Sequence, residues 1–264
     1  MQDRLEWIRL KPRAWAHWGA LRGGMQAHAR LAQTYPDATC FIAQAQEGQA
    51  QEASKIIAKP WWHPSQWRGA PVRFEMPSDD SVDMLWANMA LHESADPQAL
   101  LTQWHRALKA DGFLMFSCLG PDTAMELRSL YASLGWPPAG HELTDMHDWG
   151  DMLMQTGFAE PVMDMERITL TYETPARLLQ ELRELGRNFH PDRFQGLRSR
   201  AWKTRLEQAL AARLTGSDGR LSLTIEVIYG HALKAKPKIK VSPLSSVSVE
   251  DMRKMLRDGP GVPR

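Results

Sequence analysis

Residues 81–118 read SVDMLWANMALHESADPQALLTQWHRALKADGFLMFSC, and this stretch decides the fold class. Its beginning, Ser81–Ala87, is predicted to be a strand. Its end, Phe113–Cys118, is a continuous apolar run, which is typical of a parallel strand buried on both faces. Two such strands need a crossover connection, and the residues between them are numerous enough to form a helix.

The start of that connecting helix is marked by Asp96 and Pro97. Aspartate is a favoured N-cap, and proline is tolerated in the first turn, where its missing N–H is not needed. We expect the helix to run to about Lys109, with Gly112 as its C-cap.

Strands and helices alternate on both sides of this stretch. The sequence predicts further strands at Ala14–Trp18, Ala38–Ala43, Val162–Tyr172 and Leu221–Lys234, and further helices at Met25–Tyr35, Thr123–Leu134, Asp148–Thr156, Pro175–Leu185 and Phe194–Leu214. The segment Glu47–Arg73, which contains the Pro- and Trp-rich run Lys59–Pro71, is expected to be irregular. Alternation at this spacing argues for an α/β fold with a mainly parallel sheet.

The composition is that of an ordinary globular protein. The chain has 264 residues, of which 43% are hydrophobic and 24% charged, and its net charge is +1. This balance gives no indication of a nucleic-acid or membrane partner, and neither a signal peptide nor a bilayer-spanning run is evident. Cys40 and Cys118 lie in apolar, strand-like segments, so we expect no disulfide framework and a cytoplasmic location.

The last part of the chain differs from the rest. In residues 235–247, lysines alternate with proline and apolar residues before the run SPLSSVS, which is linker composition. Ser248–Asp251 is a capping-box pattern ahead of MRKMLR. We therefore expect residues 1–234 to form one domain, and residues 235–264 to form a flexible linker with a short helix over Val249–Arg257.

The run HWGALRGG, His17–Gly24, follows the first predicted strand and contains three glycines. Glycines between a strand and a helix are typical of cofactor loops, since they allow positive φ and close backbone approach. Leu21, however, stands where such a loop would have its middle glycine. The run is a cofactor loop, the remnant of one, or an ordinary turn.

A family resemblance is carried by several motifs in order. Residues 79–130, DDSVDMLWANMALHESADPQALLTQWHRALKADGFLMFSCLGPDTAMELRSL, resemble the fourth and fifth strands of a class I S-adenosyl-L-methionine (SAM) methyltransferase. With LGPDT, DMHDWGDML, GFAEPVMDMERITLTY and IEVIYGHALK, the chain is more closely similar to the biotin-pathway malonyl-[acyl-carrier protein] O-methyltransferase family. The resemblance covers Ser81–Lys234 well and Leu5–Ala43 weakly.

The resemblance implies a doubly wound, mostly parallel sheet of seven strands in the order 3-2-1-4-5-7-6, with the last strand antiparallel. It also implies methyl transfer from SAM to the free carboxylate of a malonyl thioester on an acyl-carrier protein. Such an in-line displacement needs orientation and exclusion of water more than acid–base help. The residues that bind the cofactor are therefore more informative than a catalytic pair, and we assign no catalytic residue and no metal.

The family's first motif, Asp-x-Gly-x-Gly-x-Gly, falls on residues 17–23 of this chain. Gly19 and Gly23 match the outer glycines, whereas His17 replaces the acid and Leu21 the middle glycine. A leucine there would place a side chain where the cofactor should lie, or force the loop open.

Three further positions bear on the cofactor. In the family an acid after the second strand binds the ribose, but here Gln44 follows that strand, with Glu47 one helical turn on as a substitute acid. The acid near the adenine aligns with Ala70. Asn88 matches the wall beside the methionine part of SAM, although a strand-end cap is an equal interpretation. The candidate cofactor-binding residues, as a vestigial site, are Gly19, Gly23, Gln44 and Asn88.

The N-terminal segment is the next departure. Members of the family carry about three more helical turns ahead of the first strand, and only Met1–Lys11 precede Pro12 here. We expect either that this lid over the cofactor is missing or that the chain start is misassigned.

Other polar residues have plain interpretations. His141, His147 and Asp148 match no standard metal-ligand spacing, so a capped helix start is expected there. His231 is expected to be a core or edge histidine of the last strand. One arginine of a C-terminal cluster could hold a malonyl carboxylate, although a solvated helix face is the default for each of them: Arg183, Arg187, Arg193, Arg198 and Arg200.

Two hypotheses about function follow. In the first, the protein is a divergent but active SAM-dependent carboxyl O-methyltransferase. In the second, it is a methyltransferase-fold pseudoenzyme whose SAM binding is weak or lost, and it acts by contact, with an acyl-carrier protein or another enzyme as partner. The changes at His17, Leu21 and Gln44, together with the short N-terminus, favour the second.

Overall fold

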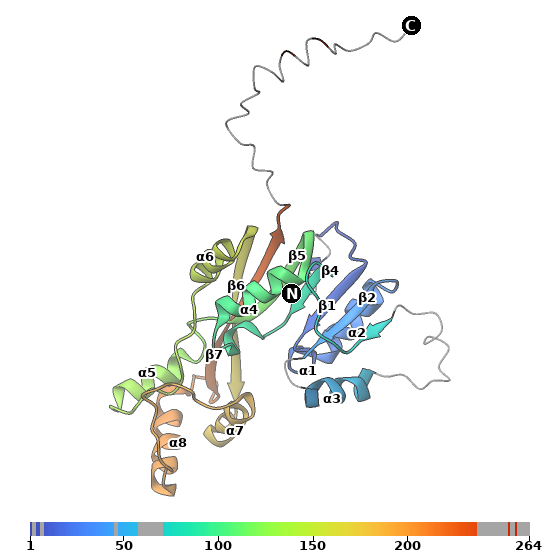
Figure 1. The fold of residues 1–264 in the computed structure, drawn as a ribbon. Helices are drawn as coiled ribbons and strands as arrows, with labels where there is room; N and C mark the ends of the chain where they lie inside the picture. Colours follow the sequence, from blue (N-terminus) through green and yellow to red (C-terminus); the bar gives the residue numbers. More distant parts are fainter. Residues whose placement is uncertain are drawn as a thin grey trace.

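Seven strands form one sheet in the order β3-β2-β1-β4-β5-β7-β6 (Figure 1). The computed structural model describes residues 1, 4–5, 8–44, 47–57, 71–236, 253 and 257. The strands are β1 (Ala14–Trp18), β2 (Thr39–Ala43), β3 (Val72–Arg73), β4 (Val82–Ala87), β5 (Leu108–Leu119), β6 (Phe158–Tyr172) and β7 (Leu221–Lys234). The helices are α1 (Ala20–Gly23), α2 (Met25–Thr34), α3 (Glu47–Ile57), the short 3-10 helix η3 (Leu91–Glu93), α4 (Pro97–Ala107), α5 (Met125–Ser133), α6 (Met146–Thr156), α7 (Pro175–Leu185) and α8 (Arg200–Leu214).

The pairing confirms the expected topology. The pairs β1–β2, β2–β3, β1–β4 and β4–β5 are parallel, and β7 is antiparallel to both β5 and β6. The strand order reverses between β1 and β4, and such a switch point is where open α/β sheets bind their ligands. The carboxyl ends of these two strands therefore define the place to look for a site.

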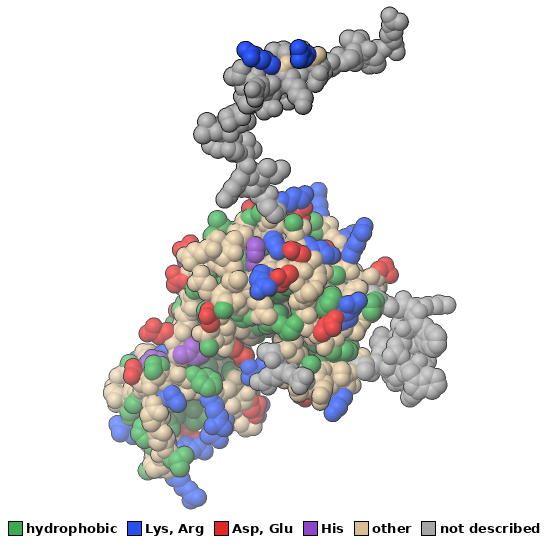
Figure 2. Space-filling model, in the orientation of Figure 1, with side chains coloured by type: hydrophobic (Ala, Val, Ile, Leu, Met, Phe, Trp, Pro, Cys, Tyr) green, Lys and Arg blue, Asp and Glu red, His purple; other side chains and the backbone are tan. Residues whose placement is uncertain are grey.

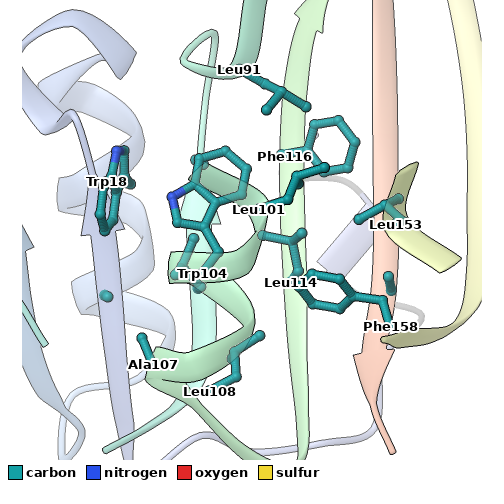
Figure 3. Close-up of a cluster of buried hydrophobic side chains, with 14 of the residues drawn as sticks. Trp18, Leu91, Leu101, Trp104, Ala107, Leu108, Leu114, Phe116, Leu153 and Phe158 are labelled. Atoms are coloured by element: carbon teal, nitrogen blue, oxygen red, sulfur yellow. The ribbon is translucent and has the colours of Figure 1, made fainter. Parts of the chain in front are cut away.

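The two faces of the sheet bury separate clusters, because neighbouring residues of β1 point to opposite sides. Trp15 lies with Leu31 of α2 and Trp86 of β4 in one cluster. The other contains Trp18, which meets Trp104 of α4 edge to face at 5.9 Å (Figure 3). His17, two residues from Trp15, is thereby directed toward the α2 side.

The helix α4 begins as predicted and ends earlier than predicted. The Asp96 carboxylate accepts from the Ala99 N–H at 2.9 Å. The helix ends at Ala107, and the predicted C-cap, Gly112, lies inside β5. A Cβ at Gly112 would lie 2.8 Å from the Lys109 carbonyl oxygen, so this glycine is explained by the close packing of the strand rather than by a helix end.

Other predictions also differ from the structure. The expectation of irregular structure over Glu47–Arg73 is wrong at both ends, which form α3 (Glu47–Ile57) and β3 (Val72–Arg73). The strands β5 and β6 begin at Leu108 and Phe158, ahead of the predicted starts. The predicted helix Phe194–Leu214 is wrong in its first turns, because α8 begins at Arg200, where the Ser199 hydroxyl accepts from the Trp202 N–H at 3.1 Å.

A lobe made of α5, α7 and α8 extends from the carboxyl-terminal edge of the sheet, the edge that also carries α1 (Figure 1). Its helices α7 and α8 connect the end of β6 to the start of β7, whereas α5 follows β5. Its own apolar cluster contains Leu178 of α7, Leu206 and Leu210 of α8 and Leu223 of β7. The lobe is therefore packed onto β6 and β7, on the β5 side of the switch point between β1 and β4.

Parts of the sequence analysis fall outside the described residues. These are residues 59–70 of the Pro- and Trp-rich run and the predicted linker from residue 237 onward. Of the predicted C-terminal helix, Arg253 and Arg257 are described, and both are helical. Within the described ranges, no helix has the length and apolarity needed to cross a membrane.

Candidate functional site

The glycine run turns directly from β1 into a helix. Gly19 has φ of +64°, and its N–H donates to the Ala43 carbonyl oxygen at the end of β2, at 2.8 Å. The Gly19 carbonyl oxygen accepts from the N–H groups of Arg22 at 3.0 Å and Gly23 at 2.8 Å. A Cβ at Gly19 would meet nothing within 4 Å, so backbone conformation, not crowding, selects glycine there.

The first free N–H groups of this turn are taken by a side chain of the protein. With its amide oxygen directed toward the loop, Gln44 accepts from the N–H of Ala20 at 3.0 Å and of Leu21 at 3.2 Å. Gln44 is only 9% exposed, so these hydrogen bonds are shielded from water. The residue expected to face the ribose instead caps the loop.

Leu21 and Arg22 also engage the rest of the protein. Leu21 is half-buried and packs against the α2-side cluster. The Arg22 guanidinium forms an ion pair with Glu93 of η3, which joins the loop to the segment after β4. Both contacts fix the loop with the chain's own side chains.

His17 replaces the acid of the first motif and is completely buried. Its ring stacks on His28 of α2, with centroids 5.7 Å apart and planes 16° apart. Within the described residues neither ring nitrogen of His17 has a hydrogen-bond partner. Burial, and secondarily the nearby His28, lowers the pKa of His17 to about 3, so the ring is neutral at pH 7.

Gly23 is explained by contact with the end of β4. A Cβ there would lie 2.9 Å from the Asn88 carbonyl oxygen. The Asn88 amide donates to the Gly23 carbonyl oxygen at 2.6 Å, and the Ser117 hydroxyl donates to the Asn88 side-chain oxygen at 2.5 Å. Asn88 thus ties the loop to the ends of β4 and β5, which agrees with its interpretation as a structural cap.

These residues do not fit SAM as the family's motif would. No carboxylate follows β1 or β2 among the side chains described at the switch point, and Gln44 occupies the loop donors. A neutral buried imidazole cannot accept from a cofactor, because no face of the His17 ring reaches solvent. The alignment of the adenine-directed acid with Ala70 is wrong in one respect, because Ala70 precedes β3 (Val72–Arg73) and the carboxylate that follows this strand is that of Glu75, which pairs with Arg73 at 3.5 Å. The side chain of Glu47 lies outside the described residues.

The structure brings the four candidate residues to one edge of the sheet. Gly19, Gly23 and Asn88 are joined through the loop contacts, and Gln44 caps the same loop. Sequence reasoning did not identify His28 or Ser117, because the partners of His17 and Asn88 come from other elements. The only signal for Ser117 in the sequence was a single hydroxyl within the otherwise apolar run Phe113–Cys118.

The remaining polar candidates have structural roles or none. Asp145 caps α6 by accepting from the His147 N–H at 2.8 Å. The ring of His231, in β7, packs against the ring of Phe113, in β5, with the centroids 5.8 Å apart. Over the described ranges, none of the five clustered arginines is part of an ion pair; these are Arg183, Arg187, Arg193, Arg198 and Arg200.

Comparison with known sequences gives the following relatives. A family model described as a methyltransferase domain matches residues 22–116. The malonyl-[acyl-carrier protein] O-methyltransferase of Gallionella capsiferriformans is 40% identical over 249 residues, which cover 90% of this chain and 83% of that protein. The protein of the same name from Nitrosospira multiformis is 34% identical, covering 91% and 82% respectively.

Comparison with solved structures supports the fold. A methyltransferase candidate from Bacillus halodurans superposes with a TM-score of 0.56 at 17% identity, covering 89% of this chain and 98% of that one. At this identity the likeness concerns the fold alone, and it agrees with the observed strand order.

Proposed function

This chain belongs to the malonyl-[acyl-carrier protein] O-methyltransferase family, and we propose that it is a member that has lost effective SAM binding and acts by contact. The proposed partner is an acyl-carrier protein, the carrier in the name of its relatives, and the proposed setting is biotin synthesis in the cytoplasm. In this view the protein is a pseudoenzyme that keeps the fold and a partner-binding surface.

The observation that carries the proposal is the position of Gln44. Its amide oxygen accepts from both Ala20 and Leu21, the donors at the start of the loop. A cofactor at this loop would have to displace Gln44 and break two buried hydrogen bonds before making its own. Because Gln44 is nearly buried, water would not readily replace the two hydrogen bonds that its displacement breaks.

The absence of the family's acids adds an energetic argument. A hydrogen bond to a buried carboxylate is worth about 1.5–3 kcal/mol. Loss of the acids toward the ribose and the adenine would weaken binding by about 3–6 kcal/mol, or roughly 10²–10⁴-fold. A micromolar site would become millimolar or weaker, unless Glu47 after β2 or Glu75 after β3 substitutes for one acid.

The alternative is a divergent but active carboxyl O-methyltransferase. It is favoured by the retention of Gly19, Gly23 and Asn88 at the switch point and by the names of the relatives. If it is correct, SAM is the cofactor, and the loop must open when SAM binds.

Calorimetric titration of the full chain with SAM tests the proposal. We expect no saturable binding below about 1 mM, in line with the loss of two charged hydrogen bonds. The combined change His17→Asp, Leu21→Gly, Gln44→Asp should recover measurable binding, because the strands that position these residues are present. Gln44→Ala, which frees the loop donors without adding an acid, is the matched control and should recover less.

A low-micromolar dissociation constant for the unaltered chain would contradict the proposal and restore the enzyme hypothesis. Methyl transfer to a malonyl-carrier protein, measured by the SAM-derived product, would contradict it as well. The triple variant also controls for folding, since recovered binding requires a folded loop.

A further inference from the structure

We propose that the segment Leu185–Arg205, called here the α7–α8 surface, binds an acidic protein partner. Its basic side chains bind carboxylates of the partner, and an exposed apolar side chain of the segment serves as the anchor. This inference rests on the proposed contact function and assigns it a place on the molecule. The surface belongs to the lobe that lies at the same sheet edge as the vestigial site (Figure 1).

The first observation is exposed apolar area. Phe189 is 76% exposed and Leu197 is 99% exposed. Leu185 and Phe194 are exposed too, so four large apolar side chains lie within a short connection. Soluble proteins rarely expose such side chains together except where they bind a partner.

The second observation is charge. Arg187–Arg205 contains six Lys or Arg residues against one Asp, a formal charge of +5 in a chain whose total is +1. Among the described residues the only ion pair made by this segment is Lys203 with Glu207, at 3.5 Å. Figure 2 shows basic and apolar side chains side by side on the lobe. An unneutralised basic patch of this kind attracts an acidic partner.

The third observation is that two guanidinium groups of this surface are positioned by aromatic rings. The Arg198 guanidinium lies 3.6 Å from the Phe194 ring centroid and 4.5 Å from that of Trp202. Arg205 lies 5.6 Å from the ring centroid of Trp136. A guanidinium stacked on a ring keeps its N–H edges free for a carboxylate, and little side-chain freedom is lost when it binds.

The support beneath the surface is ordered. Trp136 and Trp202 contact one another at 5.2 Å between centroids, and Tyr131 meets Trp136 edge to face at 5.2 Å. The Asn188 amide donates to the Pro138 carbonyl oxygen at 2.7 Å, which joins the connection to the loop after α5. The exposed side chains are thus presented from a packed base.

A protein partner fits these features better than an anionic membrane surface. The guanidinium groups have directions set by the rings, which suits carboxylates at fixed positions. Asp192 lies within the basic row and would be repelled by a continuous layer of lipid phosphates, whereas a protein can match it with a cation. We therefore commit to an acidic protein face, with Leu197 as the apolar anchor.

The test uses an acyl-carrier protein without substrate as the probe, titrated against the full chain without SAM. We expect Arg198→Glu and Leu197→Ser each to weaken binding by about tenfold, which corresponds to about 1.4 kcal/mol. Matched controls change the same chemistry elsewhere: Arg9→Glu in the N-terminal segment and Met154→Ser on α6, both at exposed positions. The controls should bind the probe within about twofold of the unaltered chain, and binding should weaken from low to moderate salt.

The outcomes separate this inference from the proposed function. If the carrier protein binds the unaltered chain and all variants equally, the partner is right and the α7–α8 surface is wrong. If the carrier protein does not bind the unaltered chain, the proposed partner and this inference both fail. Binding to phosphatidylglycerol vesicles that depends on Leu197 and Arg198, without carrier-protein binding, would assign the surface to a membrane instead.

Discussion

His17 shows how one exchanged residue changes what a site can do. An acid at this position of β1 would need a charged partner or solvent, whereas the imidazole is accommodated without either, as a neutral ring that packs with Trp15 and His28. Burial in an apolar setting disfavours the protonated form. His28, which faces it from α2, also has its pKa lowered by burial, so the two rings stay neutral together.

The buried His17 predicts that stability falls in mild acid. Its pKa is about 3 in the folded protein against 6.5 as the ordinary value, so protons favour the unfolded chain between these two pH values. The contribution of His17 alone to the free energy of unfolding should be nearly constant above pH 6.5 and fall by about 1.4 kcal/mol for each pH unit below it, and the other histidines with lowered pKa values add to this loss.

Urea unfolding of the unaltered chain and of His17→Leu, at pH 7.5 and pH 5, measures this dependence. His17→Leu should lose less stability between the two pH values, by about 2 kcal/mol. The matched control is Leu31→Ala, which removes buried volume from the same apolar cluster but no titratable group, so its cost should be equal at the two pH values. Equal pH dependence in all three proteins would contradict the neutral assignment of His17.

At the scale of elements, the turn after β5 is held by β7. Glu226 of β7 is only 3% exposed, and its carboxylate accepts from the Asp122 N–H at 2.8 Å. The Thr123 hydroxyl donates to the Glu226 carbonyl oxygen at 3.1 Å, and the Gly120 N–H donates to the same oxygen at 2.9 Å. Arg167 of β6 contacts Asp122 through its Nε at 2.8 Å and completes the attachment.

This attachment predicts coupling between Gly120 and Glu226. A Cβ at Gly120 would lie 2.5 Å from a carboxylate oxygen of Glu226, so Gly120→Ala should destabilise the fold by about 1–3 kcal/mol through overpacking. Glu226→Ala should cost about 1.5–3 kcal/mol, because the buried Asp122 N–H loses a charged acceptor.

A double-mutant cycle measured by chemical unfolding tests this coupling. The cost of Gly120→Ala should be smaller in the Glu226→Ala background, since the side chain that the new methyl group overlaps is gone. Strictly additive costs would show that the overlap is relieved by a movement elsewhere.

At the scale of the whole molecule, the apolar core of the described residues lies ahead of residue 234. The three apolar clusters draw their residues from within 1–233 of the described chain. Lys234 still contributes, by donating to the Asp80 carboxylate at 2.8 Å and to the Leu108 carbonyl oxygen at 2.6 Å. We therefore propose that the domain ends near residue 234 and that residues 235–264 are an appendage.

Ending the chain after Lys236 tests this boundary. We expect a single cooperative thermal transition with a midpoint within about 4 °C of that of the full chain. For a domain of this size, a shift of about 4 °C corresponds to a change of about 1–2 kcal/mol in the free energy of unfolding. A midpoint that falls by much more would show that the predicted helix over Val249–Arg257 docks on the body. The far-UV circular dichroism of the two chains provides the control for folding.

The sequence by itself determined most of the elements, their order and the family, but neither α3 nor β3. Burial pattern and capping are local properties, so Asp96 starts α4 and the apolar run 113–118 forms part of β5 as predicted. The departures at His17, Leu21 and Gln44 were also visible in the sequence, because they are exchanges within one short motif. The ends of α4 and α8 were predicted wrongly, since Gly112 is constrained by a neighbouring strand and Ser199 competes as a helix cap.

Only the tertiary structure decided what the exchanged residues do. Gln44 and Ala20 lie on different elements, and only the parallel pairing of β1 with β2 brings the Gln44 amide onto the loop. The stack of His17 on His28 and the link from Gly23 through Asn88 to Ser117 likewise depend on how the sheet is assembled. These hydrogen bonds and ring contacts join residues that are far apart in the sequence. They depend on how the whole chain folds, so local sequence patterns cannot predict them.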